Sequence, residues 1–514
     1  MGIRMSGIVS GLDTEAIVGA LMSAQSLKKT KVTNAKTKLE WKQTKWQGLN
    51  SKLYSLYTGS VSKMRLQTSY QAKKATVSNS GVATVSASAN AVNGSYTMEV
   101  KNIATSQYIT GGKITDKDGN KITLTSQKMS EISGNLVGKK IFVGDDEEGI
   151  EITESTTIAQ FTAALTKKGI NASFDTAQQR FFISSKESGE DNAFSLTSSD
   201  GASLAKLGLG EITIDANTKA ATVDAHEVDS ETEPIYESST GMTFVAATDS
   251  KIVLNGATLT SSSSTVSANG LSISLSSVGK TTFSVATDVD GIYDSVKAAL
   301  KEYNSVLEEL NKAYSAESSR DYEPLTSEQK DAMSDDEVKE WEDKIKSGLL
   351  RSDSTLDSII QSMKSAMQTQ VEYNGRKYSL ADLGIMTSTD WKEGGKYHIY
   401  GDSDDSVYAD QTDKLKAALN NDPELVTTVL SGVFEQLRSN MNDRMAGTEL
   451  SSALTFYNDI QMNTQLKNYK TEISEWDTRL QSLEDKYYSQ FTAMEKAMAQ
   501  MQSQQASLGS LLGG

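Results

Sequence analysis

The sequence MNTQLKNYKTEISEWDTRLQSLEDKYYSQFTAMEKAMAQM, residues 462–501, places large apolar side chains at intervals of three and four residues. This spacing is the heptad pattern of a coiled-coil helix, with one apolar stripe along an otherwise polar surface. Two successive steps of four, from Leu483 to Tyr487 to Phe491, form a stutter that should unwind the supercoil locally. The predicted seam is Met462, Leu466, Tyr469, Ile473, Trp476, Leu480, Leu483, Tyr487, Phe491, Met494, Met498 and Met501.

The N-terminal end of the chain carries a second seam of the same kind. Asp13 is a favourable N-cap and Glu15 suits the first turn, so a helix is predicted to begin directly after Asp13. Lys42 is the one charged residue in the apolar stripe that follows. The predicted seam is Val32, Ala35, Leu39, Lys42, Trp46, Leu49, Leu53 and Leu56.

A lone helix cannot bury such a stripe in water, so each seam needs a partner. We expect the two ends to pair with each other; the alternative is that each packs on a globular domain of the same chain. Between Lys28 and Lys74 the chain has twelve Lys or Arg and one acid, Glu40. This segment is either a solvated helix face or a basic helix that meets acidic neighbours in an assembly. The Met-rich stretch 494–501 suits binding a second protein or filling a core.

Between about residues 75 and 288 the chain is rich in Ser, Thr, Val, Gly and Asn and alternates with period two, which predicts antiparallel strands joined by Asn-Gly or Gly turns. Within this region, Thr157 is predicted to start a helix that ends near Gly169. Residues 220–239 are acidic and poor in large apolar side chains, which predicts a loop. The predicted strands are 75–78, 82–86, 96–100, 170–174, 180–184, 251–254, 271–275 and 281–285.

Amphipathic helices return after Asp290, and one of them opens with a capping box of Ser334 and Glu337. A hairpin is predicted over 371–401, and the amphipathic segment around 415–437 is predicted to be helical. The fold class is therefore α+β and multidomain, with terminal coiled-coil helices, a helical bundle, and two antiparallel-sheet-rich domains inserted one within another. The predicted domains are 1–40 with 462–514 (terminal helices), 41–72 with 289–461 (bundle), 73–108 with 241–288 (outer strand domain) and 109–240 (inserted α+β domain).

Composition excludes several classes of protein. A chain of 514 residues is too long for one hydrophobic core. The absence of Cys excludes disulfides, thiol catalysis and Cys-ligated zinc. A net charge of -16 argues against nucleic acid as a partner. No apolar run approaches the roughly 18 residues of a membrane span, and the first residues lack the apolar core of a signal peptide. We therefore expect no membrane insertion, and export by a route other than general secretion.

Three motifs that could carry chemistry are incomplete. Residues 279–281 resemble the end of a phosphate loop, but Ser274 stands where its first Gly belongs. His226–Glu227 opens like a zinc-protease helix, but Ser230 replaces the second His. Residues 116–120 resemble a calcium loop without its sharp-turn Gly. We therefore predict hairpin turns at the first and third segments, and expect no enzymatic activity, no cofactor and no metal ligands.

Short segments spread along the chain resemble, in order, the flagellar hook-associated protein 2 family, the cap of the bacterial flagellar filament. One departure is Ser26, where family members often have Pro, so an uninterrupted first helix is expected. The segments are Ser6–Thr14, Asn93–Tyr96, Val100–Ala104, Asn255–Gly256, Gly270–Leu275, Tyr303–Asn304, Gly348–Leu356 and Leu380–Ile385.

The resemblance implies a secreted, extracellular protein at the filament tip, where a ring of identical subunits promotes the folding and insertion of flagellin. It also implies hook–filament junction proteins, the flagellar export apparatus and a dedicated export chaperone as partners. In that family the terminal helices enter the filament, the bundle is the leg, and the strand domains are the head. A surface adhesin, a junction protein or a flagellin-like subunit remain the alternatives. The predicted assembly-interface residues are Val32, Leu39, Trp46, Leu49, Leu53, Leu56, Leu466, Tyr469, Ile473, Trp476, Leu480, Leu483, Tyr487, Phe491, Met494, Met498 and Met501.

Overall fold

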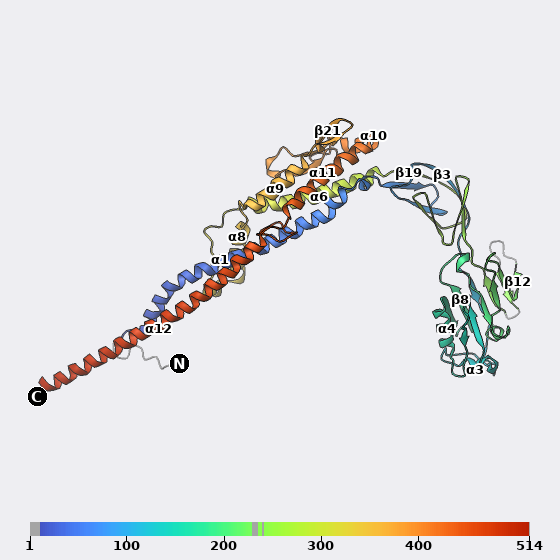
Figure 1. Cartoon of the computed structure of the whole chain (residues 1–514), viewed down its shortest axis with the longest axis horizontal. Coiled ribbons are helices and arrows are strands. Elements are labelled where there is room, and N and C mark those ends of the chain that lie inside the picture. The colour runs from blue at the N-terminus through green and yellow to red at the C-terminus, as the bar shows by residue number, and fades with distance from the viewer. Residues whose placement is uncertain (1–10, 229–234, 239–240, 513–514) are drawn as a thin grey trace. The chain divides into compact units, whose positions relative to one another are not determined.

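The computed structural model describes residues 11–228, 235–238 and 241–512, so the predicted N-terminal signature at Ser6–Thr14 lies largely outside the described residues. The chain forms two compact units, Met1–Tyr70 with Val289–Gly514 and Gln71–Asp288. The first unit is mainly helical, whereas the second is built of antiparallel strands (Figure 1). The predicted α+β, multidomain fold class is confirmed.

The N-terminal helix α1, Thr14–Leu56, is continuous. The Asp13 side chain caps it by accepting a hydrogen bond from the Ala16 N–H at 2.9 Å. The helix runs without a break through Ser26, as predicted from the absence of Pro there. It ends in a π-helical turn, η1 (Tyr57–Val61), in which Gly59 departs from helical geometry with φ -86° and ψ -106°. The short elements α2 (Ser62–Met64) and η2 (Gln67–Tyr70) follow.

A bundle of helices packs against the second half of α1. Its members are α6 (Val289–Tyr314), α8 (Asp335–Gly348), α9 (Ser354–Met367) and α11 (Pro423–Arg444), with the shorter α7 (Ser327–Asp331) and α10 (Lys414–Asn421). The predicted capping box of Ser334 and Glu337 is present at α8. The segment around 415–437 is helical as expected, and it is divided into α10 and α11 before Pro423, which stands at the first turn of α11 and lacks an N–H.

Two small hairpins stand beside this bundle where one was expected. The first joins β20 (Val371–Tyr373) to β21 (Arg376–Tyr378) through Asn374 and Gly375, whose positive φ values of 50° and 77° fit a type I′ turn. The second joins β22 (Ile385–Thr387) to β23 (Tyr397–Ile399) through a longer loop. That loop contains the 3-10 turn η6 (Trp391–Glu393), and η5 (Leu380–Leu383) precedes β22.

The C-terminal helix α12 spans Asp459–Leu512 and is the longest helix of the unit. It is uninterrupted across the predicted stutter at Leu483–Phe491, so the change of heptad phase is absorbed without breaking the helix. The predicted boundary between residues 461 and 462 falls inside α12, and the boundary between residues 40 and 41 falls inside α1. The expected terminal helices and bundle therefore share two continuous helices.

One core of the strand unit lies between a five-stranded sheet, ordered β1-β19-β3-β15-β16, and a three-stranded sheet, ordered β17-β18-β2. Asn255 and Gly256 make the predicted turn between β15 and β16, with φ of 47° and 86°. The segment 279–281, predicted as a turn, instead begins β19. The strands are β1 (Lys73–Val77), β2 (Ala83–Ala87), β3 (Gly94–Asn102), β15 (Ser250–Leu254), β16 (Ala257–Ser261), β17 (Thr265–Ala268), β18 (Leu271–Leu275) and β19 (Gly279–Thr287).

A second core in the strand unit is formed by residues from Ile109 to Phe244. It contains a five-stranded sheet, ordered β11-β10-β9-β5-β6, a six-stranded sheet, ordered β12-β13-β14-β4-β8-β7, and the predicted helix α4 (Ile158–Lys167), capped by Thr157. The remaining elements are β4 (Tyr108–Thr110), α3 (Met129–Ile132), η3 (Gly134–Leu136), β5 (Lys140–Val143), β6 (Ile150–Glu151), β7 (Ile170–Asp175), β8 (Arg180–Ser185), η4 (Glu190–Asn192), β9 (Leu196–Ser198), α5 (Ser203–Lys206), β10 (Ile212–Ile214), β11 (Ala221–Val223), β12 (Ala225–Val228), β13 (Ile235–Ser238) and β14 (Thr243–Val245).

The prediction of a loop over residues 220–239 is wrong where the structure describes it. This segment contains β11, β12 and β13, and β12 pairs with β13 from Ala225–Ser238 to Val228–Ile235. Pairing with neighbouring strands forms these elements, because β11 pairs with β10, and β13 pairs with both β12 and β14. Composition alone therefore misled the prediction.

Candidate assembly interface

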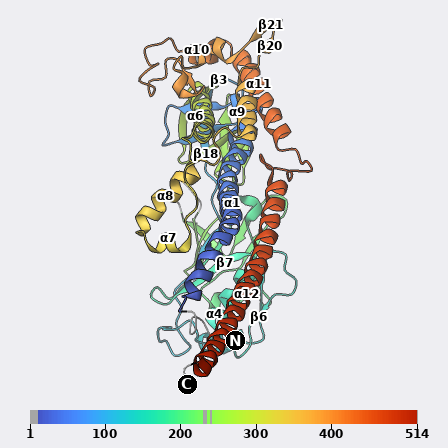
Figure 2. The same cartoon turned by 90° about the vertical axis from the view of Figure 1, so that its left-hand side faces the viewer.

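The two terminal helices pair with each other in an antiparallel hairpin, as expected from their seams (Figure 1). The Asn50 side chain accepts a hydrogen bond from the Phe456 N–H at 2.8 Å, and the Gln43 amide donates to Asn463 at 2.8 Å. Further out, Lys29 forms an ion pair with Asp477. Residue numbers therefore rise on α12 as they fall on α1, in one constant register. Figure 2 shows the two helices side by side over this length.

At its base, the end nearer the bundle, the hairpin is part of a hydrophobic core. The Trp46 ring stacks on the Tyr457 ring with centroids 5.6 Å apart, and Trp46 is only 2% exposed. Leu53 and Leu56 are fully buried, because α1 also contacts α6 and α8 at this level. Burial, with the nearby Asp459 carboxylate, raises the pKa of Tyr457. Both of the expected arrangements, helix on helix and helix on domain, therefore occur here.

Beyond the bundle the seam is only half covered. Val32 and Leu39 on α1, and Ile473 and Trp476 on α12, are partly exposed. Two helices alone leave the flanks of a seam open to water, whereas a third or fourth helix would cover them. Because the Trp476 ring is partly open to water, two cations can lie over it: Lys28 Nζ is 5.8 Å and the Arg479 guanidinium 5.1 Å from its centroid.

The last turns of α12 extend past the described part of α1. Continuing the register of the hairpin places Thr14, where α1 begins, opposite Thr492. Met498 is partly exposed and Met501 is 61% exposed. The distal end of the predicted C-terminal seam is therefore not buried by α1.

The basic segment of α1 meets acids of the same chain. Lys38 pairs with Glu323 at 2.7 Å and Lys42 with Asp353 at 2.7 Å. Lys45 donates to the carbonyl oxygens of Lys346 and Ser347 at the C-terminal end of α8. Lys42, the charged interruption of the seam, is thus an attachment point to the N-cap of α9. The basic segment therefore does meet acidic partners, as one of the two alternatives expected, but these acids belong to the same chain and not to a neighbouring subunit.

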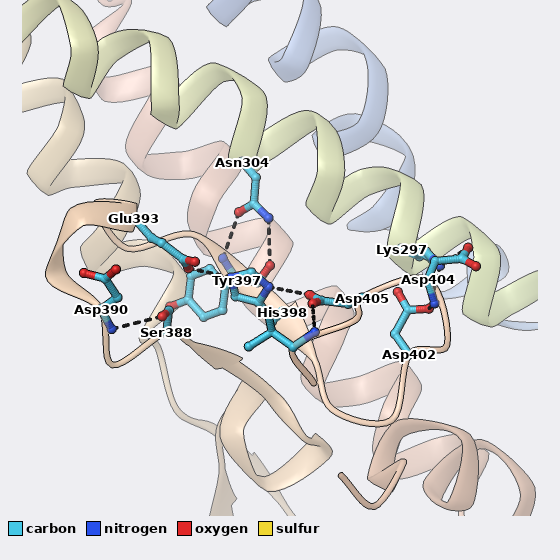
Figure 3. Close-up of polar contacts among 11 residues, drawn as sticks. Lys297, Asn304, Ser388, Asp390, Glu393, Tyr397, His398, Asp402, Asp404 and Asp405 are labelled. Atoms are coloured by element: carbon cyan, nitrogen blue, oxygen red, sulfur yellow. Dashed lines mark hydrogen bonds and ion pairs between the residues drawn. The ribbon is translucent and has the colours of Figure 1, made fainter. Parts of the chain in front are cut away.

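A second cluster of polar contacts was missed from the sequence (Figure 3). The His398 ring lies between two carboxylates, with Nδ1 2.6 Å from Asp405 and Nε2 2.8 Å from Glu393. Asn304 of α6 binds the backbone of Tyr397 on both sides, donating at 2.7 Å and accepting at 2.8 Å. These contacts fix the long loop of the second hairpin to α6.

The predicted assembly-interface residues divide into three groups by burial. Residues close to the bundle are buried, those along the outer hairpin are partly exposed, and the last Met is exposed. The buried group is Trp46, Leu49, Leu53, Leu56 and Leu466; the partly exposed group is Val32, Leu39, Tyr469, Ile473, Trp476, Leu480, Leu483, Tyr487, Phe491, Met494 and Met498; the exposed residue is Met501.

Among helices in residues 11–228, 235–238 and 241–512, none is both long and apolar enough to cross a membrane. The same residues contain no cluster of three or more His, Cys, Asp or Glu side chains arranged to hold a metal ion.

The sequence of this chain is similar to those of known proteins. The sequence profile described as Flagellar hook-associated protein 2 N-terminus matches residues 10–107, and the one described as Flagellar hook-associated protein 2 C-terminus matches residues 247–503. The chain is 27% identical to flagellar hook-associated protein 2 of Halalkalibacterium halodurans, covering 98% of this chain and 99% of that protein. It is 24% identical to the Escherichia coli K12 protein of the same name, covering 98% and 96%.

Among solved structures, the chain is similar to the D1-D2-D3 domains of the flagellar cap protein FliD from Escherichia coli. The TM-score is 0.51 at 21% identity, and the match covers 78% of this chain and 97% of that one. At this identity the similarity concerns the fold. The order of helical and strand-rich parts is thus one already seen in a solved protein.

Proposed function

The chain belongs to the flagellar hook-associated protein 2 family, and from that premise we propose that it is a structural protein that caps the distal tip of the bacterial flagellar filament. The role is mechanical, not catalytic. A ring of identical subunits would sit at the growing end and promote the folding and insertion of exported flagellin.

The observation that carries this proposal is the order of the two family matches. The N-terminal match contains all of α1, and the C-terminal match contains most of α12, so both halves of the terminal hairpin are family features. Most of the outer strand domain and the bundle are also covered, whereas the inserted domain, residues 109–240, lies entirely between the two matches. The matched parts are the ones that an axial assembly would need.

The half-covered outer hairpin suits a contact that must form and be remade. Partly exposed seam residues such as Val32, Ile473 and Trp476 offer apolar area without a closed core, so neighbouring subunits can complete it at modest cost. We place the assembly interface on this stretch and on the exposed end of α12. Flagellin, the hook–filament junction proteins, the export apparatus and an export chaperone are the proposed partners, and the proposed location is extracellular.

The test is a deletion strain complemented with the full chain or with a chain that ends at Leu480. The full chain should restore filaments. The shortened chain removes the outer part of α12 but keeps the buried base, so it should fold yet leave flagellin free in the medium. Circular dichroism of the purified shortened protein controls for folding.

Other outcomes identify the alternatives. Normal filaments in the deletion strain would contradict a cap and favour an adhesin. Electron microscopy of the purified full chain separates the remaining alternatives, because a cap forms closed rings whereas a filament subunit or junction protein forms open fibres.

A further inference from the structure

The most exposed large apolar side chain among the described residues is Trp391, at 83%. It stands in η6, on the loop between β22 and β23, and the loop is held firmly. Three residues on one face of α6 hold the loop and the strand that follows it. Asn304 binds the Tyr397 backbone, Glu308 pairs with Lys396 at 2.7 Å, and Asn311 donates to the Gly394 carbonyl at 3.1 Å. A rigid loop that exposes a Trp has the properties of a docking anchor.

Gly394 shows how closely the loop is fitted to α6. Its φ of 67° lies in the left-handed region, and a Cβ there would stand 2.6 Å from the Asn311 amide nitrogen. Beyond it, the carboxylate of Glu393 is held by His398, whose other nitrogen contacts Asp405 (Figure 3). The orientation of η6 is therefore set from both sides.

The loop itself has two acids and two lysines, but the segment that follows β23, which His398 contacts through Asp405, is strongly acidic. Between Asp390 and Asp413 the chain has seven acids and two lysines. Lys297 pairs with Asp402 and Asp404, and Lys396 pairs with Glu308 of α6, so only part of this charge is neutralised. A surface that receives Trp391 should therefore be apolar at its centre and basic at its rim.

The same helical unit contains such a surface. A groove of about 680 Å³ lies between α1 and α6, with Gly48, Leu49, Ala313 and Ala316 along it. Gly48, Ala313 and Ala316 have little or no side chain and leave room for a large one, and the volume lies within the usual range of ligand pockets.

Three lysines line the rim of this groove, Lys45, Lys52 and Lys312, against two acids, Glu309 and Glu317. Lys52 and Glu309 pair with each other. Burial, followed by repulsion from Lys312, lowers the pKa of Lys45, so the rim favours an incoming negative charge.

Loop and groove lie on different faces of α6. Residues 304, 308 and 311 are centred about 125° around α6 from its groove residues 309, 312 and 313, at 3.6 residues per turn. Their midpoints differ in height by only about 5 Å at 1.5 Å per residue. One copy cannot fill its own groove, but copies set side by side with their bundles parallel bring one loop to the next groove.

We propose that the 388–398 loop of one copy docks through Trp391 into the α1–α6 groove of a second copy. Because loop and groove are different surfaces, the contact is heterologous, and its repetition about an axis parallel to α6 generates a ring or a shallow helix. This inference rests on the proposed cap function. It identifies the contact by which the helical bundles of neighbouring subunits would meet in the ring.

The natural chain has no Cys, so a thiol-specific cross-linker reacts only with cysteines introduced at chosen positions. Full-length protein carrying Lys392→Cys on the loop and Ser347→Cys at the groove should give a ladder of dimers, trimers and higher species with a bismaleimide. The matched control carries Lys392→Cys and Gln436→Cys, where Gln436 is an exposed residue of α11 away from the groove, and should give no ladder. A ladder from the control pair alone overturns the proposal.

Affinity provides the second measurement. Trp391→Ala and Lys312→Glu should each weaken self-association of the full chain by tenfold or more in sedimentation velocity, as expected for an interface hot spot. Leu124→Ala, which removes a side chain 64% exposed in the strand unit, is the control and should change it less than threefold. Unchanged circular dichroism confirms that each variant is folded.

The two proposals fail in different ways. If the unaltered chain forms rings and caps filaments, but Trp391→Ala and Lys312→Glu do so equally well and no loop–groove ladder forms, the docking contact alone is wrong. If the unaltered chain neither assembles nor restores filaments, the cap function is wrong and the docking contact with it.

Discussion

The base and the outer part of the α1–α12 hairpin carry the same heptad pattern, yet one is a core and the other an open seam. Trp46 at the base is 2% exposed and stacks on Tyr457, whereas Trp476 further out is partly exposed and faces cations. The difference lies in the neighbours, because α6 and α8 reach α1 only near the bundle. A heptad seam thus specifies a helix and its apolar side, and the number of packed neighbours decides what that side does.

This difference separates two mechanical roles. The base fixes the hairpin to the bundle, so it should open only with unfolding of the whole unit. The predicted seam residues of the outer part are only partly buried, although Thr14 and Val18 near the start of α1 are buried, so this part should open at lower free energy. For a proposed cap that is remade as each subunit adds, an anchored base and an adaptable tip belong on the same pair of helices.

The sharpest test of this contrast is a matched pair of substitutions. Trp46→Ala should lower the free energy of unfolding by about 3–5 kcal/mol, the usual cost of removing a fully buried large aromatic side chain. Trp476→Ala should cost below about 1 kcal/mol, because its ring is already partly in water. Urea denaturation of the helical unit, followed by far-ultraviolet circular dichroism, measures both.

Equal losses for the two Trp variants would contradict the contrast, since they would make the outer seam as well packed as the base. Leu53→Ala and Leu480→Ala are a second pair, with Leu53 fully buried and Leu480 partly exposed. Their losses should differ in the same direction.

The segment that joins α11 to α12 should make the free energy of unfolding depend on pH. The Asp459 carboxylate accepts hydrogen bonds from the Ser452 N–H and hydroxyl, both at 2.6 Å. Although burial raises the pKa of Asp459, these hydrogen bonds outweigh it and hold the pKa below its ordinary value. Asp459→Asn should therefore lower the free energy of unfolding at pH 7 by about 2 kcal/mol, the scale of hydrogen bonds to a charged group.

The sign of the pH effect follows from the lowered pKa. The contribution of the Asp459 carboxylate is complete above the ordinary Asp value of about 3.9 and is lost as pH falls through the lower value in the folded protein. The difference between the natural chain and Asp459→Asn should thus be largest at pH 6–8 and shrink below about pH 4. A difference that stayed constant down to pH 3 would exclude this origin.

Periodicity predicted the elements of this fold well where the pattern was long. Both seams, the Asp13 cap, the Ser334 capping box and the Asn255–Gly256 turn are present because each depends on local chemistry alone. The strands within residues 220–239 were missed, because their pairing depends on β10 and β14 as neighbours. Their own side chains carry no comparable signal.

The candidate interface was predictable only in part. The heptad pattern predicted which residues form the apolar stripe. It did not predict that the stripe changes from a buried core to a partly exposed surface, because that change depends on where the bundle ends. The basic segment suggested partners, but the acids it meets, such as Glu323 and Asp353, are far away in sequence. The Trp391 loop was missed, because exposure of a single Trp has no periodic pattern; the density of acids between Asp390 and Asp413 was the one available signal.

Ion pairs should repeat the contrast on a smaller scale. Lys42 and Asp353 meet beside the bundle, where the Asp353 side chain is 11% exposed, whereas Lys29 and Asp477 meet on the outer hairpin, where Asp477 is 55% exposed. Screening by water makes exposed pairs worth about 0–0.5 kcal/mol, and the less exposed pair should contribute about 1 kcal/mol. Double-mutant cycles of Lys42→Met with Asp353→Asn, and of Lys29→Met with Asp477→Asn, measure the two coupling energies. A larger coupling for the outer pair would reverse the expected order.

The smallest expected effect is a gain in stability at the turn into α12. Leu454 has φ of 65°, a left-handed conformation that costs an L side chain about 1–2 kcal/mol, and its side chain is 52% exposed. Leu454→Gly removes that cost but adds freedom to the unfolded chain, so the net gain should be about 0.5 kcal/mol. Leu454→Ala is the control, because it removes the same exposed side chain while keeping the unfavourable φ. Denaturation should therefore rank Gly above Ala by about 0.5 kcal/mol, and the opposite order would mean that the base of the hairpin holds no strain at this residue.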